Sequence, residues 1–454
     1  MRNFLASVGL CLATVLLNRP ANAQFQLQRL YTAPSTSQQP GSIVQGNDGN
    51  FYGTLVNASS GYVFKMTPAG TVTILGTMFG LNRELALGDD GNVYGTVNTQ
   101  PFGGNTNGYI FKVAPNGQIS TVFPFDGSNG ARPVGMRRGV DGTFYGLMVV
   151  SNENHFALPP VTNQTSIFQF TTNNTVTILY SLTNSPYFTG LPVEGPDGNL
   201  YGSTFTTGTL IFPQFGSPYR ISFYRLSTSG DFQTIYTRSN APAAAGDLIF
   251  GPDGALYGAL DGIGRPYSPN PNYGSVFRID TNGLYSPLFS FNSTTGSNPQ
   301  ARLLLANDGY LYGSTFAGGV SNKGTLFRIS VQGEFTSLLD FIGDNGSGPS
   351  APLIQASDGN FYGTTDSSKL SGIGTIFRLV QPTAISNFVL SNSVASFTWN
   401  SFPEGIYRVD YKSSLSDTAW VPLIQRVTAT DLTITIFDNF ATDPQRLYRV
   451  ALLP

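Results

Sequence analysis

Charged side chains are scarce in this sequence of 454 residues. Lys and Arg together number 24 and Asp and Glu 26, so charged residues make up 11% of the chain, against about a quarter in most globular proteins. The net charge of −2 provides no basic surface that gathers phosphates. Nucleic-acid binding and polybasic docking to a membrane are therefore disfavoured.

Cysteine and histidine occur once each, as Cys11 and His155. Cys11 lies within an N-terminal apolar run that we expect to be removed, so the mature chain has no disulfide and no thiolate ligand. A single histidine does not complete a histidine metal site, and no nucleophile-elbow motif accompanies it. No cofactor, metal site or catalytic residue is predicted. His155 is interpreted as an exposed loop residue, with a role as general base or ligand as the alternative.

Long apolar runs are absent after the first. Arg2 precedes the apolar residues 4–17, and Ala21 and Ala23 form a small-residue cleavage motif, so residues 1–23 are predicted to be a secretory signal peptide. That run is shorter than the roughly 20 residues of a membrane helix. We expect a secreted protein, extracellular or associated with the cell surface, monomeric and without a membrane span.

Aromatic residues and glycine are abundant instead. Aromatic side chains make up 13% of the chain, and glycine numbers 52. This composition is sufficient to build a core, and it suits short strands joined by tight turns. No helical periodicity follows the signal peptide, so an all-β fold is expected.

An Asp-Gly pair followed by a Tyr-Gly pair recurs seven times, at intervals of about 52 residues, which is close to the kelch and WD periods. The paired residues are Asp48, Asp90, Asp141, Asp197, Asp253, Asp308 and Asp358, and Tyr52, Tyr94, Tyr145, Tyr201, Tyr257, Tyr312 and Tyr362. Each copy has short β-branched and aromatic runs, with a hairpin signal at Asp-Gly. Four antiparallel strands per copy are typical of a propeller blade, which predicts a seven-bladed β-propeller.

The two ends of the repeat array are complementary. The seventh copy stops at Val380 after its third strand, whereas residues 25–32 precede the first copy and match the fourth strand of other copies. We predict that residues 25–32 pair with the last blade and close the ring, because an open ring exposes a strand edge.

The repeats resemble the GloVer tandem-repeat proteins, a family of secreted bacterial β-strand repeats with varied C-terminal anchors. The matching stretches begin at Gly309, Gly318 and Gly324, and the resemblance covers about residues 40–380. It implies export and a repeat fold, and it implies no activity. The third and fourth repeats depart most, because they lack the glycine before the aromatic strand and carry long insertions.

A second domain is predicted after Pro382. Residues 384–454 contain six strand-like runs and resemble a small fibronectin type III-like β-sandwich, with Trp399 as the core tryptophan and Tyr407 and Tyr411 on the facing strand. The expected domains are the signal peptide 1–23, the propeller 24–382 and the sandwich 383–454. The resemblance implies a spacer or attachment role for the last.

The repeated polar residues are interpreted as structural. The Asp-Gly carboxylates are expected to bond nearby backbone NH groups, with calcium binding or charge recognition as the alternative. Six repeats place a basic residue after the central aromatic of the third strand, and it is expected to cover its own strand: Lys65, Lys112, Arg225, Arg278, Arg328 and Arg378. The tyrosines are expected to fill the space between blades, and the following glycines to admit a neighbouring backbone.

Long loops in the third, fourth and fifth repeats predict a binding surface on one sector of one rim, because loops on a rigid scaffold carry function. The candidate ligand-binding residues are His155, Phe156, Phe205, Phe212, Phe215, Tyr219, Arg220, Arg265, Tyr267 and Tyr273.

The leading function is a non-enzymatic exported propeller that binds or scaffolds a polysaccharide or cell-surface polymer through this sector. One alternative is a carbohydrate-active enzyme, a glycosidase or lyase that uses loop carboxylates such as Glu153, Asp261 and Asp366. The other is a purely structural surface protein.

Overall fold

A computed structural model describes residues 25–34, 38–57, 60–98, 107–151, 163–183, 186–206, 220–239, 246–262, 273–366, 374–380, 385–391, 394–401, 406–414, 416–431, 433–439 and 446–453. The predicted signal peptide lies outside these ranges. Over the described ranges the protein contains β-strands and no helix, so no helix there is long and apolar enough to cross a membrane. The all-β prediction is confirmed for this part of the chain.

The chain divides into two compact units, of which the larger comprises residues 27–355 and 361–379. This repeat region contains one antiparallel sheet per repeat. The first sheet is β2 (Gln39–Gln45), β3 (Phe51–Val56), β4 (Gly61–Met66) and β5 (Val72–Met78). The second is β6 (Leu81–Leu87), β7 (Val93–Val97), β8 (Tyr109–Val113) and β9 (Ile119–Pro124). The third is β10 (Pro133–Arg138), β11 (Phe144–Ser151), β12 (Asn163–Thr171) and β13 (Thr175–Thr183).

The remaining sheets follow the same order. The fourth is β14 (Tyr187–Phe188) and β15 (Val193–Glu194), both paired with β16 (Leu200–Thr206), then β17 (Arg220–Leu226) and β18 (Phe232–Ser239). The fifth is β19 (Ile249–Phe250), β20 (Leu256–Asp261), β21 (Gly274–Ile279) and β22 (Tyr285–Ser290). The sixth is β23 (Leu304–Leu305), β24 (Leu311–Thr315), β25 (Thr325–Ile329) and β26 (Phe335–Asp340). The seventh is β27 (Ile354–Gln355), β28 (Phe361–Thr365), β29 (Thr375–Val380) and β1 (Gln26–Thr32).

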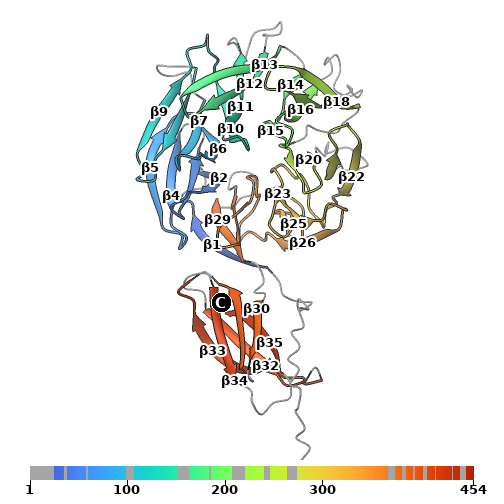
Figure 1. Ribbon diagram of the computed structural model, residues 1–454. Coiled ribbons are helices and arrows are strands. Elements are labelled where there is room, and N and C mark those ends of the chain that lie inside the picture. The colour runs from blue at the N-terminus through green and yellow to red at the C-terminus, as the bar shows by residue number, and fades with distance from the viewer. Residues whose placement is uncertain are drawn as a thin grey trace, which may run out of the picture. The chain divides into compact units, whose positions relative to one another are not determined.

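The sheets surround a common centre, with the first strand of each repeat innermost (Figure 1). β1 pairs with β29, so the N-terminal strand is the outer strand of the seventh sheet, as the sequence predicted. The first and seventh sheets also touch: the rings of Phe51 and Tyr362 lie 4.3 Å apart, and Thr364 Oγ1 donates to the Gly41 carbonyl at 3.0 Å.

Each Asp-Gly hairpin is stabilised by its aspartate. In all seven repeats Oδ1 accepts the backbone NH two residues later, as for Asp48 and Asn50 at 3.1 Å. The following glycine has positive φ, 77° at Gly49, which favours glycine. The turn interpretation is confirmed, and it extends further. In the first six repeats the repeat tyrosine donates its hydroxyl to Oδ2 of the same aspartate, at 2.7 to 3.1 Å.

The basic residue of the third strand does more than cover its own strand in two repeats. Lys65 Nζ lies 2.8 Å from Oδ2 of Asp48, and Arg278 Nη2 lies 2.8 Å from Oδ2 of Asp253. In these repeats the hairpin carboxylate is therefore bound by a cation as well as by backbone and tyrosine donors.

The tyrosines are core residues, each 2% exposed or less. Contacts between neighbouring sheets, such as Tyr312 with Phe361 at 4.1 Å, show that they pack between sheets as predicted. The glycines that follow the repeat tyrosines pack against an aromatic ring, whereas a neighbouring backbone was expected there. A Cβ at Gly53 would collide with the ring of Phe64 on the third strand of its own sheet, and the other six glycines meet the corresponding ring. They admit a side chain, and at Gly146 the carbonyl oxygen of Gly135 also lies 2.6 Å from the position of a Cβ, so the predicted backbone neighbour is present there.

The C-terminal unit comprises residues 380–454 together with 1–26 and 356–360. One of its two three-stranded sheets is β30 (Ile385–Ser391), β31 (Val394–Asn400) and β34 (Thr433–Asn439). The other is β33 (Val421–Thr428), β32 (Ile406–Lys412) and β35 (Leu447–Leu453). Trp399 is fully buried, and its ring lies 5.8 Å from that of Tyr407 on the other sheet, so Trp399 is the core tryptophan that the sequence predicted.

Candidate functional site

The predicted rim sector is only partly described. Seven of its residues lie outside the described ranges: His155, Phe156, Phe212, Phe215, Tyr219, Arg265 and Tyr267. Of the rest, Arg220 is exposed at the start of β17, and Tyr273 is half-buried against the core. Phe205 is not a rim residue, because it is 8% exposed and its side chain belongs to the core between the fourth and fifth sheets.

A different group of polar residues comes together at the centre of the repeat region. In each sheet one innermost residue pairs with the repeat tyrosine, as Val44 does with Tyr52. The residue two positions earlier has the same sequence offset in every repeat and lies within the innermost strand or just before it. These residues are Ser42, Glu84, Gly135, Leu191, Asp247, Arg302 and Pro352. Three of the seven are charged, so one layer at the centre holds two carboxylates and a guanidinium.

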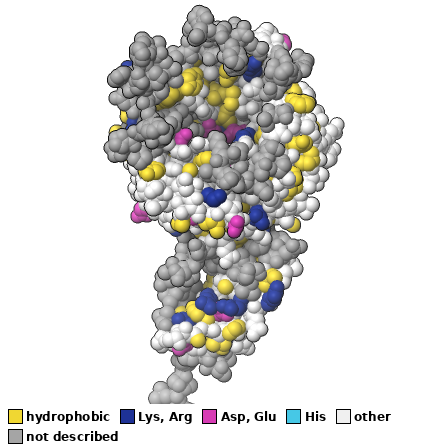
Figure 2. All heavy atoms as spheres, turned by 180° about the vertical axis from the view of Figure 1, so that it is seen from behind, with side chains coloured by type: hydrophobic (Ala, Val, Ile, Leu, Met, Phe, Trp, Pro, Cys, Tyr) yellow, Lys and Arg dark blue, Asp and Glu magenta, His cyan; other side chains and the backbone are white. Residues whose placement is uncertain are grey.

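Direct contacts place this layer in space. A Cβ on Gly135 would lie 3.7 Å from Oε2 of Glu84 and 3.5 Å from Cδ1 of Leu191, so three consecutive repeats meet there. The backbone NH of Leu191 donates to Oδ1 of Asp247 at 2.8 Å, which joins the fourth repeat to the fifth. Figure 2 shows acidic and basic side chains together inside the hollow at the centre of this region.

Arg137 joins the layer from the third repeat. Its Nη2 lies 2.5 Å from Oδ2 of Asp247, and its Nη1 donates to the Leu248 carbonyl at 2.8 Å. The guanidinium thus reaches past the fourth repeat to the fifth. Both side chains are largely buried, with 11% of Arg137 and 15% of Asp247 exposed, so the pair is shielded from solvent and its attraction is weakly screened.

Glu84 has no such partner. It accepts no hydrogen bond from the described residues, and it is half-buried. Burial, reinforced by the charge of Asp247 and opposed by Arg302 and Arg137, raises the pKa of Glu84 to about 7. This carboxyl therefore changes its protonation state near neutral pH.

Three buried polar atoms beside these carboxylates have no hydrogen-bond partner: Nε of Arg137, Nε of Arg302 and the hydroxyl of Tyr224. Burial lowers the pKa of Arg302, and the charge of Arg137 adds to this effect. Burial also raises the pKa of Tyr224, and the charges of Arg137 and Asp247 act on its hydroxyl. The group Glu84, Arg137, Tyr224, Asp247 and Arg302 is called the central cluster below.

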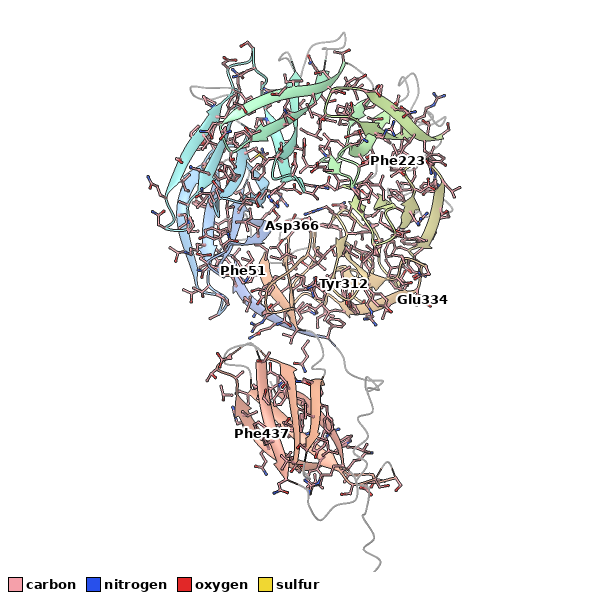
Figure 3. All side chains as sticks on the ribbon, viewed as in Figure 1. Phe51, Phe223, Tyr312, Glu334, Asp366 and Phe437 are labelled. Carbon is pink, nitrogen blue, oxygen red and sulfur yellow. The ribbon has the colours of Figure 1, made fainter. Side chains whose placement is uncertain are left out.

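A second pair of charges lies near the centre. Arg83 Nη1 is 3.8 Å from Oδ2 of Asp366, which joins the second repeat to the seventh (Figure 3). Asp366 is 5% exposed, so this predicted loop carboxylate is a buried one. Of the two other carboxylates considered from the sequence, Asp261 ends β20 with a buried Oδ1, and Glu153 lies outside the described residues.

Sequence reasoning missed the central cluster, although alignment of the repeats contains its signal. On the innermost strand, the residue that pairs with the repeat tyrosine is apolar in six repeats, and Arg137 is the exception. On the third strand, the residue that pairs with the glycine after this tyrosine is Phe in six repeats, and Tyr224 is the exception. Both departures fall on the group that the fold brings together.

Comparison with protein families gives one match. A profile of the Gloeobacter/Verrucomicrobia repeat matches residues 14–211 and 189–404, which together include all seven Asp-Gly hairpins. No protein of curated function is significantly similar to the chain.

Solved structures of similar fold come from several bacteria. A catalytically inactive virginiamycin B lyase from Staphylococcus aureus, crystallised with quinupristin, is 16% identical, with 79% of this chain and 99% of that chain covered and a TM-score of 0.50. A protein from Lactobacillus plantarum is 13% identical, with 88% of this chain and 99% of that chain covered and a TM-score of 0.46. A gluconolactonase from Xanthomonas campestris is 12% identical, with 79% of this chain and 90% of that chain covered and a TM-score of 0.40. The likeness to the lyase supports a propeller-like fold and nothing about ligands.

Proposed function

Because the chain belongs to the Gloeobacter/Verrucomicrobia repeat family, we propose that it is an exported, seven-bladed β-propeller that binds a polysaccharide or another cell-surface polymer. The central cluster is its principal binding site. The rim sector that includes Arg220 and Tyr273 gives a longer ligand a second contact, and the C-terminal sandwich, of fibronectin type III-like fold, serves as the attachment module.

One observation carries the binding role. Buried polar groups in folded proteins almost always have hydrogen-bond partners, and leaving one unpaired costs about 1–3 kcal/mol. Three such groups lie together here, on Arg137, Tyr224 and Arg302, beside the unpaired carboxyl of Glu84. Ordinary packing does not require two of them, since the positions equivalent to Arg137 and Tyr224 are apolar in the other six repeats. A polar ligand that enters the hollow would provide their partners.

Contacts between the first and last sheets support the same role, because a closed ring would make the centre a rigid wall. β1 pairs with β29, and the contacts of Phe51 with Tyr362 and of Thr364 with Gly41 join the first and last sheets. A closed propeller leaves only short, protected sheet edges and holds the inner strands at fixed spacing. Side chains from repeats far apart in sequence can then form one preorganised site.

The test is a glycan array probed with the secreted chain and with Arg302→Gln. We expect selective binding of a small set of glycans by the wild type and its loss in the variant. Arg225→Gln is the matched control, because Arg225 is next to Tyr224 but bonds Gln233 on the outer strand. Binding that survives both substitutions places the ligand elsewhere, and the rim residues are tested next through Arg220→Gln and Tyr273→Ala.

A carbohydrate-active enzyme is the second candidate, and Glu84 favours it. Two carboxyls in one site with different protonation states suit acid and base roles in glycoside chemistry. Asp247 is ion-paired with Arg137, whereas burial holds Glu84 protonated up to near neutral pH. Turnover of an array-selected glycan by the wild type, with binding but no turnover in Glu84→Gln, would establish this candidate.

A further inference from the structure

The charges of the central cluster do not cancel evenly. Arg137 and Asp247 form a close ion pair, so they largely neutralise each other. Arg302 and Glu84 remain, at equivalent sequence positions of the sixth and second repeats, and neither makes a hydrogen bond to the other among the described residues. When Glu84 is protonated, the cluster holds one uncompensated positive charge.

We propose that the central cluster binds a carboxylate group of the ligand, held between the guanidinium of Arg302 and the carboxyl of Glu84. This inference rests on the proposed function and names the chemistry of its ligand as an acidic polymer, such as a polyuronate. Arg302 supplies charge-assisted donors, and the protonated Glu84 supplies an O–H donor. Asp247 stays paired with Arg137 and keeps the anion on the Arg302 side.

The charge balance favours a carboxylate over a phosphate. With Glu84 protonated the site has a net charge of +1, which a single carboxylate neutralises. A phosphate monoester carries about −1.5 to −2 at neutral pH, and its additional charge would face Asp247 in a poorly screened interior. The other cation near the centre, Arg83, is engaged with Asp366 of the seventh repeat.

Binding of this kind takes up a proton. The groups that face Glu84 are Asp247, Arg302 and Arg137, and their combined effect with burial brings its pKa to about 7. A carboxylate placed beside it raises that pKa further, because a second negative charge disfavours ionisation. Only the protonated form is competent, so the apparent affinity falls by about tenfold between pH 6 and pH 8.

Three probes test the ligand class by isothermal titration calorimetry with the secreted chain. D-galacturonate and D-galactose differ only by the carboxylate, and acetate is the carboxylate alone. We expect galacturonate to bind more tightly than galactose, by about tenfold or more at pH 6, with uptake of close to one proton on comparison of buffers with different ionisation enthalpies. Acetate should raise the pKa of Glu84, and this pKa is measured from the pH dependence of the carbon NMR signal of its carboxyl group.

Two variants locate the effect. Glu84→Gln keeps a neutral donor, so it should bind galacturonate at pH 8 as tightly as the wild type does at pH 6, and its proton uptake should disappear. Arg302→Gln should lose at least tenfold in affinity at both pH values. Arg225→Gln should match the wild type, and thermal melting of each variant verifies its folding.

The outcomes separate the two proposals. Equal binding of galactose and galacturonate, abolished by Arg302→Gln, overturns the carboxylate inference and leaves the binding site in place. Binding that is unaffected by Arg302→Gln and Glu84→Gln overturns the central site itself. Absence of any response to galacturonate and to acetate also overturns the inference, while the glycan array tests the polymer-binding role independently.

Discussion

The guanidinium of Arg137 lies 2.5 Å from the carboxylate of Asp247 and joins the third repeat to the fifth across the fourth. A contact that skips a repeat is unusual for an architecture in which each unit packs mainly on its neighbours. It is possible because Gly190 and Leu191 of the fourth repeat bring a backbone NH, not a bulky side chain, to the same carboxylate. The pair therefore fixes the spacing of three repeats at the centre.

Loss of Arg137 should destabilise the repeat region. In Arg137→Gln the largely buried carboxylate of Asp247 keeps the Leu191 NH but loses its cation, and removing one partner of a buried pair costs about 3 kcal/mol or more. Urea unfolding measures the free energy. Arg138→Gln is the control, because the neighbouring Arg138 pairs with the exposed Asp89 and should change the free energy by less than about 1 kcal/mol. Equal effects of the two substitutions would contradict the assignment.

Tyr224→Phe should leave stability unchanged or increase it by up to about 1 kcal/mol. The hydroxyl is buried without a hydrogen-bond partner, so the folded state pays the desolvation free energy of this group without gaining a hydrogen bond. Removing the hydroxyl eliminates that cost and gives the phenylalanine found in the other six repeats. The melting temperature reports the result, and ligand affinity measured in parallel should fall. Tyr312→Phe is the contrast, because its hydroxyl donates to Asp308 at 2.8 Å; destabilisation of equal size in both would show that Tyr224 has a partner.

The hairpin aspartates should make stability fall at acid pH. Partial burial of Asp48 acts to raise its pKa, but hydrogen bonds from Lys65, Asn50 and Tyr52 outweigh it and bring the pKa to about 2. The unfolded value is about 4, so the native state binds fewer protons. This stabilisation is present above pH 4 and is lost as the pH falls towards 2.

Asp48→Asn should therefore lower the unfolding free energy by about 1 kcal/mol at pH 6, with the difference from wild type vanishing near pH 2. A series of urea titrations between these pH values measures it. Asp89→Asn, at a side chain that is 70% exposed, should show little effect throughout. A difference for Asp48→Asn that is independent of pH would exclude this carboxylate as the titrating group.

Deletion of residues 24–33 should lower the melting temperature by several degrees, because it removes β1 and exposes the edge of β29, whose six residues are all buried. Differential scanning calorimetry of a chain that begins at residue 24 and of the same chain without residues 24–33 makes the comparison. Gln28→Ala removes only the side-chain bond from Arg378 and should have a much smaller effect. Identical melting of the truncated and full chains would disprove ring closure.

Most of the repeat architecture could be predicted because its local determinants are strong. Positive φ after each aspartate requires glycine in practice, so the Asp-Gly pairs fixed seven hairpins and, with them, seven sheets. Strand boundaries carry a weaker signal: residues 420–424 form a strand-like run in the sequence, whereas β33 is Val421–Thr428 and Trp420 lies before it. Alternation of side chains does not determine where a strand leaves its sheet.

The central cluster could not be derived from spacing in the same way. Glu84 and Arg302 belong to repeats far apart in the sequence, and they approach each other only when the sheets surround one centre. For a related reason, the sequence did not predict which group packs against the glycine that follows each repeat tyrosine. Sequence indicates a close approach at Gly53, but only the pairing of β3 with β4 places the ring of Phe64 there.

The pairing of β1 with β29 also governs the order of folding. Gln28 and Arg378, which bond across these strands, are separated by 350 residues. A chain synthesised from its N-terminus holds its first strand without its native neighbour until the seventh repeat has been made. Contacts of such long range slow folding, so the last step should be the docking of β1. Intermediates in which the seventh sheet has formed without β1 should expose an unpaired edge on β29, which is prone to aggregation.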